Sequence, residues 1–311
     1  MVSLLPSATE IVCAIGAGEL LVGRSHECDH PAGVRELPSV TRSRIGNHRS
    51  SRGIHEEVQS AVRDALSIYE VDTKLLAELA PDVILTQDLC EVCAVSRKEV
   101  ESAVSRLARR PIRVVNLRPR RLGDIWQDVL RVGEALGRAE DARALAAMLE
   151  DRAAEISVRA AVPTRPRVLA LEWMDPTMLA GLWMPELIDL AGGRGMGPGA
   201  GEDAVTVDRV ALAALVPDVV LIKPCGFTIE RSEREIALLP RVLPWSKWAC
   251  VPAGRVFIAD GNAYFNRPGP RIAESLEILA AIVHPKRFAD LSARHAAAFR
   301  RVTRELDLVE A

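Results

Sequence analysis

The chain has 311 residues, about twice the common domain size, so two lobes or one large α/β unit are expected. Hydrophobic residues make up 49% and charged residues 26%, a globular composition, and no segment approaches the roughly 18 uninterrupted apolar residues that a membrane span requires. The net charge of −2, from 40 basic and 42 acidic residues, provides no overall field that would attract nucleic acid.

The first predicted element is a buried strand over residues 2–5, and a helix follows it. Ser7 is the expected N-cap of this helix, because Glu10 lies three residues later and completes the capping-box pattern. The opening residues lack the basic and apolar segments of a secretory signal peptide. They therefore predict a cytoplasmic location, or an extracytoplasmic one if the start is mis-assigned.

A sequence motif that occurs twice is the strongest sign of an internal repeat. Residues 75–86 predict a short helix that ends before Pro81 and then a buried strand. A similar motif occurs at 212–222 around Pro217, which lies 136 positions after Pro81. Further strands are expected at residues 114–117, 167–171 and 256–259. Two similar halves of alternating strands and helices are therefore expected.

Residues 122–161 carry apolar side chains at helical spacing and predict a long helix between the halves, with Gly137 as a candidate interruption. The predicted division is an N-terminal lobe over 1–118, a connecting helix over 119–161 and a C-terminal lobe over 162–311. Alternating strands and helices indicate an α/β fold with mostly parallel sheets, in which ligands collect at the carboxyl ends of the strands.

The residues after the expected strands of the first half are polar. A strand at 20–23 is followed by His26 and Glu27, which with His30 match the zinc-protease pattern His-Glu-x-x-His. That chemistry needs both histidines on one helical face, and Pro31 disfavours a helix here, so the protease interpretation is rejected. Gln87 and Asp88 follow the strand that ends at residue 86.

Four cysteines also follow expected strands: Cys28, Cys90, Cys93 and Cys225. Such thiols could hold zinc or an iron–sulfur cluster if they converge. They could equally be small apolar fillers, or a redox-prone pair at the CxxC spacing of residues 90–93. Both interpretations stay open.

The strand ends of the second half add Glu172 and Trp173 after one strand, and Asp260, Tyr264, Phe265 and Arg267 after another. The aromatic rings and the guanidinium could hold a large planar or anionic ligand by stacking and by charge-assisted hydrogen bonds. Alternatively, Tyr264 and Phe265 pack the loop onto Trp183 or Trp173.

Several segments, in order and spacing, resemble the substrate-binding proteins that deliver cobalamin and iron–siderophore complexes to ABC importers. They are LLPSATE at 4–10, DHP at 29–31, LAPDVI at 79–84, the connecting helix and RPGPR at 267–271. The resemblance covers nearly the whole chain. It implies two Rossmann-like lobes joined by a long rigid helix, with a ligand cleft between them. It also implies docking to an ABC permease through glutamates, for which Glu10 is the matching position.

The sequence resembles in particular a branch identified as cobalamin-binding proteins, with CEVC at 90–93 and PCGF at 224–227 as its signature. It departs from the family in having acids and thiols where stacking rings are expected, and in an added helix at about 54–68. The first hypothesis is a non-enzymatic binder of a metal chelate, a corrinoid or a siderophore-like compound. The alternative is an intracellular metalloprotein or thiol redox protein with a cysteine-ligated zinc or iron–sulfur site.

Overall fold

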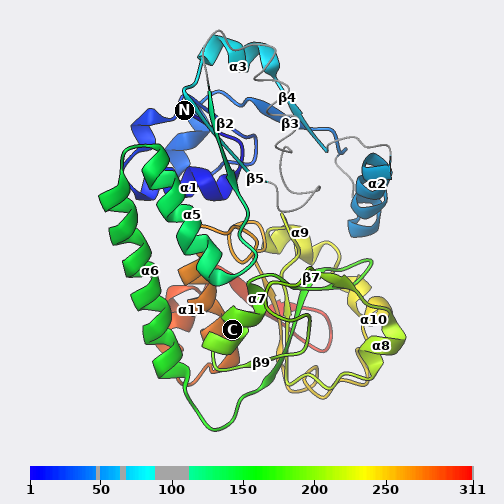
Figure 1. Ribbon diagram of the computed structural model, residues 1–311. Helices are drawn as coiled ribbons and strands as arrows, with labels where there is room; N and C mark the ends of the chain where they lie inside the picture. The colour runs from blue at the N-terminus through cyan, green and yellow to red at the C-terminus, as the bar shows by residue number, and fades with distance from the viewer. Residues whose placement is uncertain (47–49, 64–67, 88–111, 310–311) are drawn as a thin grey trace. The chain divides into compact units, whose positions relative to one another are not determined.

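The structure is a computed structural model that describes residues 1–46, 50–63, 68–87 and 112–309 (Figure 1). It contains two compact units. The first comprises Met1–Arg49, Gly53–Pro119 and Gly123–Leu149, and the second comprises Ser50–Arg52, Arg120–Leu122 and Glu150–Ala311. Both combine parallel strands with helices, which confirms the α/β class. The lobe boundaries at 118 and 161 stay a prediction.

The first unit is built on a four-stranded parallel sheet of order β2-β1-β5-β6. Its strands are β1 (Val2–Ser3), β2 (Gly23–Arg24), β5 (Val83–Gln87) and β6 (Arg113–Leu117), and a separate antiparallel pair is formed by β3 (Thr41–Ser43) and β4 (Tyr69–Val71). Its helices are α1 (Pro6–Ala14), α2 (Ser51–Arg63), α3 (Thr73–Leu79) and α5 (Leu122–Ala135), with 3₁₀ turns η1 (Gly18–Leu20) and η2 (Ala32–Glu36). The first two residues of α2 and the first residue of α5 belong to the second unit. One face of the sheet packs on α3 through a cluster that includes Val2, Leu76 and Ile84.

Local chemistry explains where these helices begin and end. Helix α1 begins at Pro6 after an N-cap at Leu5, so the prediction of Ser7 as N-cap is wrong. Proline suits the first helical position because its fixed φ and missing N–H cost nothing there. Helix α3 is capped by Asp72, whose carboxylate accepts from the Leu75 amide at 2.9 Å, and it ends before Pro81 as expected. The strand expected at 20–23 lies later, at Gly23–Arg24, because residues 18–20 form a 3₁₀ turn.

The second unit has a mixed sheet of order β10-β8-β7-β11-β12-β13-β14, with β9 paired to β7. Its three central strands, β7 (Arg167–Trp173), β11 (Val219–Ile222) and β12 (Val256–Ala259), are parallel, and the outer pairs are antiparallel. The remaining strands are β8 (Met178–Leu179), β9 (Arg194–Gly195), β10 (Val205–Thr206), β13 (Phe299–Val302) and β14 (Leu308–Val309). The carboxyl ends of the three central strands therefore lie on one edge of the sheet.

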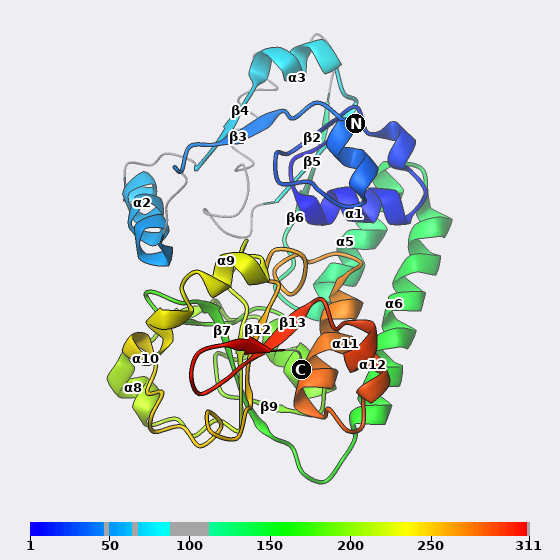
Figure 2. The same cartoon turned by 180° about the vertical axis from the view of Figure 1, so that it is seen from behind.

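Helices cover both faces of this sheet, with α11 and α12 on one side and α8 and α10 on the other (Figure 2). The helices are α7 (Met184–Leu190), α8 (Arg209–Ala213), α9 (Ile229–Glu233), α10 (Leu239–Val242), α11 (Ile272–Val283) and α12 (Ala289–Arg294), with the 3₁₀ turn η3 (Ile236–Leu238). The core on the α8 and α10 side includes Leu212, Leu239 and Trp248, which pack on Leu171 and Ile222. The buried strands thereby fix the position of the loops that follow them.

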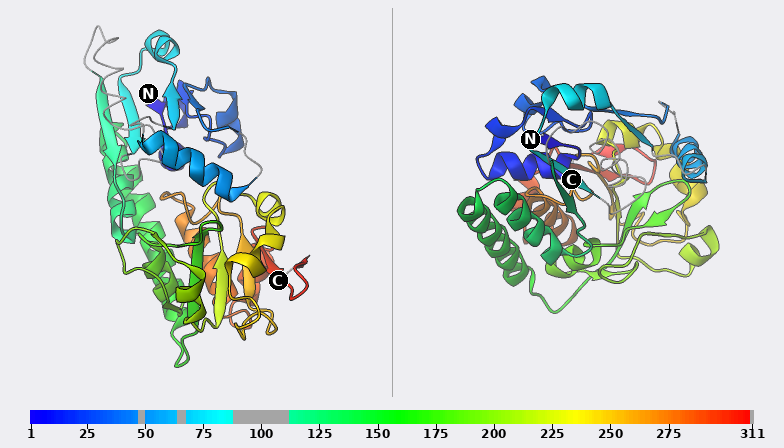
Figure 3. Two further views of the ribbon diagram at one scale, coloured as in Figure 1. Left: turned by 90° about the vertical axis from the view of Figure 1, so that its right-hand side faces the viewer. Right: turned by 45° about the horizontal axis from the view of Figure 1, so that its top comes forward.

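Helices α5 and α6 (Ala139–Ala160) lie side by side (Figures 1 and 3). The chain breaks between them at Gly137, whose φ of +70° is a conformation that glycine adopts without strain. Their contact is close at Gly133, where an added Cβ would lie 2.2 Å from the Cβ of Ala142. Within the described residues, no helix is long and apolar enough to cross a membrane.

Candidate functional site

Three segments form what we call the second-unit edge: residues 172–175, which are the end of β7 and the residues after it, and the loops after β11 and β12 at 223–227 and 260–267. At its centre is Lys223, whose side chain is only 1% exposed. The Lys223 ammonium donates to Asn266 Oδ1 at 2.5 Å and to Glu172 Oε2 at 3.4 Å. Glu172 lies at the end of β7 and Asn266 in the loop after β12, so one buried ammonium joins three strand ends.

Backbone contacts fix the same three loops to one another. The Asn266 amide group donates to Lys223 O at 3.2 Å and to Gly261 O at 2.8 Å. Gly261 lies so close to the loop after β11 that an added Cβ would be 2.1 Å from Pro224 O. The Cys225 amide donates to Glu172 O at 3.1 Å. This edge is therefore a preorganised surface, which lowers the entropy cost of binding a ligand there.

Trp173 and Phe227 form an aromatic pair on this edge, with ring centroids 5.0 Å apart. The Trp173 indole N–H donates to the carbonyl of Ser51 at 3.2 Å. The Arg231 guanidinium lies 4.1 Å from the centroid of the Phe227 ring and 2.7 Å from a carboxylate oxygen of Glu235. The two rings thus pack against each other and against polar groups of the same unit.

The loop after β12 is held by its own polar groups. Asp260 accepts from the amides of Asn262 and Ala263 at 2.9 and 2.8 Å. Burial raises the pKa of Asp260, although these two hydrogen bonds and the charge of Arg267 oppose the shift. Arg267 is 7% exposed and donates to Asn262 Oδ1 at 3.2 Å. The guanidinium of Arg267 is thus largely committed to the loop.

The two aromatic residues of this loop differ in exposure. Phe265 is fully buried, and its carbonyl accepts from the Trp183 indole at 2.8 Å, so its ring belongs to the core as the packing alternative stated. Tyr264 is partly exposed, with the Arg271 guanidinium 5.5 Å from its ring centroid. Of the two rings, Tyr264 has the surface to contact a ligand.

In the first unit, the loop after β2 carries the other predicted binding residues. His26 is half-buried, and its Nδ1 lies 2.8 Å from Thr41 Oγ1, which also accepts from the His26 amide. Burial lowers the pKa of His26 despite the opposing charge of Glu27. Glu27 accepts from the Tyr69 hydroxyl at 2.8 Å. Residues 25–31 are not helical, which agrees with rejection of the protease motif.

Gln87, the last residue of β5, is 7% exposed, so little of its side chain reaches a ligand. Asp88 lies outside the described residues. Glu10, the predicted docking residue, is 3% exposed within α1. Burial argues against contact of the Glu10 carboxylate with a permease, and its docking role stays a prediction.

The structure describes two of the four cysteines of the predicted thiol site. Cys28 is 1% exposed and accepts from Thr9 Oγ1 at 3.0 Å, which is the environment of a structural thiol. Cys225 is half-buried on the second-unit edge. Cys90 and Cys93 lie outside the described residues. Among the residues that are described, no group of three histidine, cysteine or acidic side chains could hold a metal ion.

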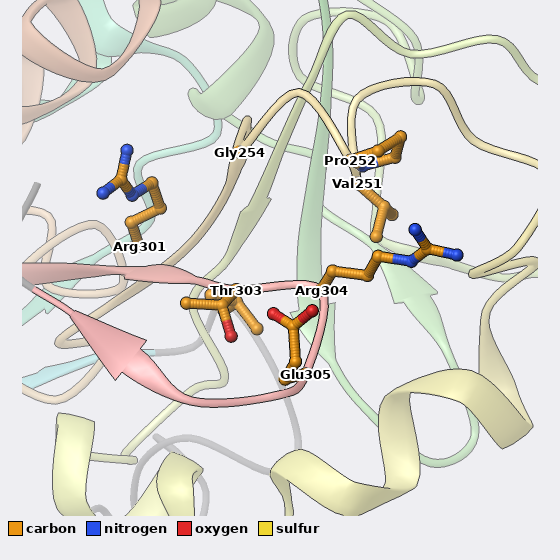
Figure 4. A pocket seen from close by; sticks show the side chains of 8 residues that line it. Val251, Pro252, Gly254, Arg301, Thr303, Arg304 and Glu305 are labelled. Atoms are coloured by element: carbon orange, nitrogen blue, oxygen red, sulfur yellow. The ribbon is translucent and has the colours of Figure 1, made fainter.

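Two hollows of the second unit lie at the opposite edge of the sheet. One of about 320 Å³ is lined by Val251, Gly254, Arg301 and Glu305 next to the start of β12 (Figure 4). The other, of about 410 Å³, is lined by Arg167 and Arg194 next to the start of β7. Neither includes a predicted site residue.

The fold is that of solved periplasmic binding proteins for heme and vitamin B12 and of an ABC-transporter substrate-binding protein. A periplasmic heme-binding protein from Pseudomonas aeruginosa is 20% identical, with a TM-score of 0.68 over 91% of this chain and 92% of that one. A periplasmic vitamin B12-binding protein of Vibrio cholerae is 18% identical, with a TM-score of 0.64 over 91% and 95%. An ABC-transporter substrate-binding protein from Listeria monocytogenes is 17% identical, with a TM-score of 0.69 over 91% and 98%. No protein-family model and no curated protein sequence matches the chain.

The predicted cytoplasmic location is contradicted by these comparisons, because the similar structures include periplasmic proteins. The prediction depended on the first residues of the chain. Residues Val2–Ser3 form the strand that pairs with both β2 and β5, so they are part of the folded unit. Their composition reflects sheet packing and carries no information on the compartment.

Proposed function

We propose that the chain binds a metal-chelate ligand, a corrinoid or a siderophore-like compound, and delivers it to an ABC permease. The observation that carries the proposal is the second-unit edge, where Lys223 contacts Glu172 at the end of β7 and Asn266 in the loop after β12. In α/β folds, ligands bind at the carboxyl ends of the strands, and this edge is the end that β7, β11 and β12 share.

The chemistry of the edge suits a large, partly apolar ligand with polar groups at its rim. Trp173 and Tyr264 provide partly exposed aromatic surface, and Glu172 provides a carboxylate. Binding sites of this kind combine apolar and aromatic surface with a small number of fixed polar groups. We propose Glu172, Trp173, Asp260, Tyr264 and Arg267 as the ligand-contacting set of this unit, and His26 and Glu27 as candidates in the first unit.

The neutral form of His26 gives that candidate a specific chemical capacity. The lowered pKa favours the neutral imidazole, and Nδ1 is occupied by its contact with Thr41 Oγ1. In the tautomer whose Nδ1–H donates to Thr41 Oγ1, the lone pair is on Nε2, which is a good ligand for cobalt or iron. The Cys28 thiol, by contrast, is 1% exposed and accepts a hydrogen bond from Thr9 Oγ1.

Calorimetric titration of the reduced, metal-free protein with cobalamin, cobinamide, a ferric hydroxamate siderophore and heme tests the proposal. Absorbance spectra in the visible range should be recorded in parallel, because a change of axial ligand shifts the bands of a corrinoid or a heme. Micromolar or tighter binding of one chelate is expected. Absence of binding for every one of these compounds would refute the proposed function.

A further inference from the structure

The two carboxylate oxygens of Glu172 have different surroundings. Oε2 lies 3.4 Å from the Lys223 ammonium. Oε1 has no hydrogen-bond partner among the residues that the structure describes, and the side chain is 27% exposed. One oxygen is therefore held from behind by a cation, and the other is available to a ligand.

Lys223 itself cannot present its charge to a ligand. Its side chain is 1% exposed, and its donors point to Glu172 and to Asn266 Oδ1. The nearby guanidinium of Arg267 is 7% exposed and already donates to Asn262. Of Lys223, Arg267 and Glu172, the most accessible polar group is the Glu172 carboxylate, which is a negatively charged hydrogen-bond acceptor.

The Lys223 contact also orients this acceptor. A glutamate side chain has three rotatable bonds and loses up to about 2 kcal/mol of rotamer entropy when it is ordered. The ammonium and the fixed loops order Glu172 before any ligand arrives, and ligand binding then does not bear that cost. A fixed acceptor discriminates between ligands more sharply than a mobile one.

We propose that Glu172, positioned by Lys223, selects a chelate whose rim carries amide N–H donors over one whose rim carries carboxylates. An amide N–H would form a charge-assisted hydrogen bond with Oε1, whereas a carboxylate would face a like charge. Corrinoids carry carboxamide side chains and heme carries carboxylates. The inference rests on the proposed function, because it names the class of chelate that the second-unit edge prefers.

The test compares two ligands that differ by one group. Cyanocobalamin and its separated monocarboxylate isomers, in each of which one side-chain amide is hydrolysed to an acid, are titrated at pH 7.5, where the acid is ionised. For the wild-type protein, at least one isomer should bind about tenfold or more weakly than cyanocobalamin. In Glu172→Gln, the same isomer should bind within about threefold of cyanocobalamin, because an uncharged amide can donate to a carboxylate.

Two variants separate charge from structure. Glu305→Gln makes the same change at an exposed position next to the start of β12, and it should keep the wild-type ratio of affinities. Glu172→Asp keeps the charge and should still discriminate against the acid. Melting temperatures show whether each variant is folded. The ratio of the wild-type affinities for cyanocobalamin and its acid isomers remains a test even if one variant does not fold.

The outcomes are distinguishable. If neither cyanocobalamin nor any acid isomer binds the wild-type protein, the corrinoid inference fails, and heme or siderophore binding in the earlier titration decides the proposed function. If cyanocobalamin and every isomer bind equally well, the selection by Glu172 is wrong while corrinoid binding stands. A wild-type preference that Glu172→Gln leaves unchanged would assign the selection to another residue and overturn the inference.

Discussion

Glu277 of α11 accepts a hydrogen bond of 2.6 Å from Nε2 of His295, and a second of 2.7 Å from Nε of Arg152. The Glu277 carboxylate is 4% exposed. Burial alone would raise its pKa, but the hydrogen bonds from His295 and Arg152 outweigh burial and lower the pKa from 4.5 to about 2. This buried ion cluster joins α6 to α11 within the second unit.

The cluster predicts how stability depends on acid pH. Since the pKa in the folded state is depressed, the stabilisation is complete above pH 4.5 and is lost as the pH falls toward 2, by up to about 3 kcal/mol. The substitution Glu277→Gln should remove most of this dependence of the free energy of unfolding on pH. Urea unfolding at pH 6, 4 and 2.5 measures it, with Glu150→Gln on the exposed face of α6 as the control. Parallel pH profiles for wild type and Glu277→Gln would contradict the prediction.

The effect of Asp128 of α5 on stability should change with pH in the direction opposite to that of Glu277. Its side chain is fully buried, and burial raises its pKa from 3.8 to about 7 against the opposing charge of Arg131, whose Nη1 lies 2.5 Å away. The folded state therefore binds a proton that the unfolded chain has released between pH 3.8 and 7, so the free energy of unfolding falls as pH rises through this range, by up to about 4 kcal/mol.

Asp128→Asn should remove that loss, because an asparagine is neutral at every pH. The variant should gain stability relative to wild type as the pH rises from 5 to 8, measured by urea unfolding. Glu134→Gln, at an exposed position of the same helix, is the matched control and should follow wild type. A constant difference between Asp128→Asn and wild type across this range would show that Asp128 does not change its protonation on unfolding.

Local patterns predicted the elements that depend on neighbouring residues. Strand β12 occupies the expected residues 256–259, and the helix before Pro81 ends where the proline requires. In each case, the signal is periodicity or a helix stop within a short window. The antiparallel strands β3, β4, β13 and β14 were not predicted, because each has at most four residues and shows no resolvable period.

Lys223 shows why the site was only partly predictable. Its partners Glu172 and Asn266 are 51 and 43 residues away in the chain, so no local pattern marks the lysine as buried. Sequence reasoning placed Glu172 at a strand end because the β7 pattern is clear. It missed Lys223 because a lysine after a strand is usually exposed. The offset between Pro81 and Pro217 predicts the position of the loop after β11. The role of Lys223, the first residue of that loop, depends on its tertiary contacts.

Gly261 should tolerate no side chain. A Cβ at this position would lie 2.1 Å from Pro224 O and 2.8 Å from Lys223 O, and both are backbone atoms that the parallel strands hold in place. Gly261→Ala should therefore destabilise the protein by about 1 to 3 kcal/mol and weaken ligand binding. Gly123→Ala, in α5 with no atom within 4 Å of the added Cβ, should instead raise stability by about 0.5 to 1 kcal/mol. Urea unfolding of both variants and titration of Gly261→Ala with the ligand would check the pair.

Reactivity of the thiols would show whether a ligand occupies the second-unit edge. Cys250 is 3% exposed, and burial raises its pKa to about 11, so at pH 8 only about one molecule in a thousand carries its thiolate. Cys225 is half-buried on the edge and should react with iodoacetamide well before Cys250.

A saturating ligand should slow the alkylation of Cys225 several-fold, because the ligand would cover the loop after β11. It should leave the rate at Cys13 of the first unit, which is also half-buried, unchanged. Mass spectrometry of peptides from timed samples measures the three rates in one experiment. If a chelate that binds tightly by calorimetry leaves the Cys225 rate unaltered, the ligand lies elsewhere, and the assignment of Glu172 and Tyr264 to the site fails with it.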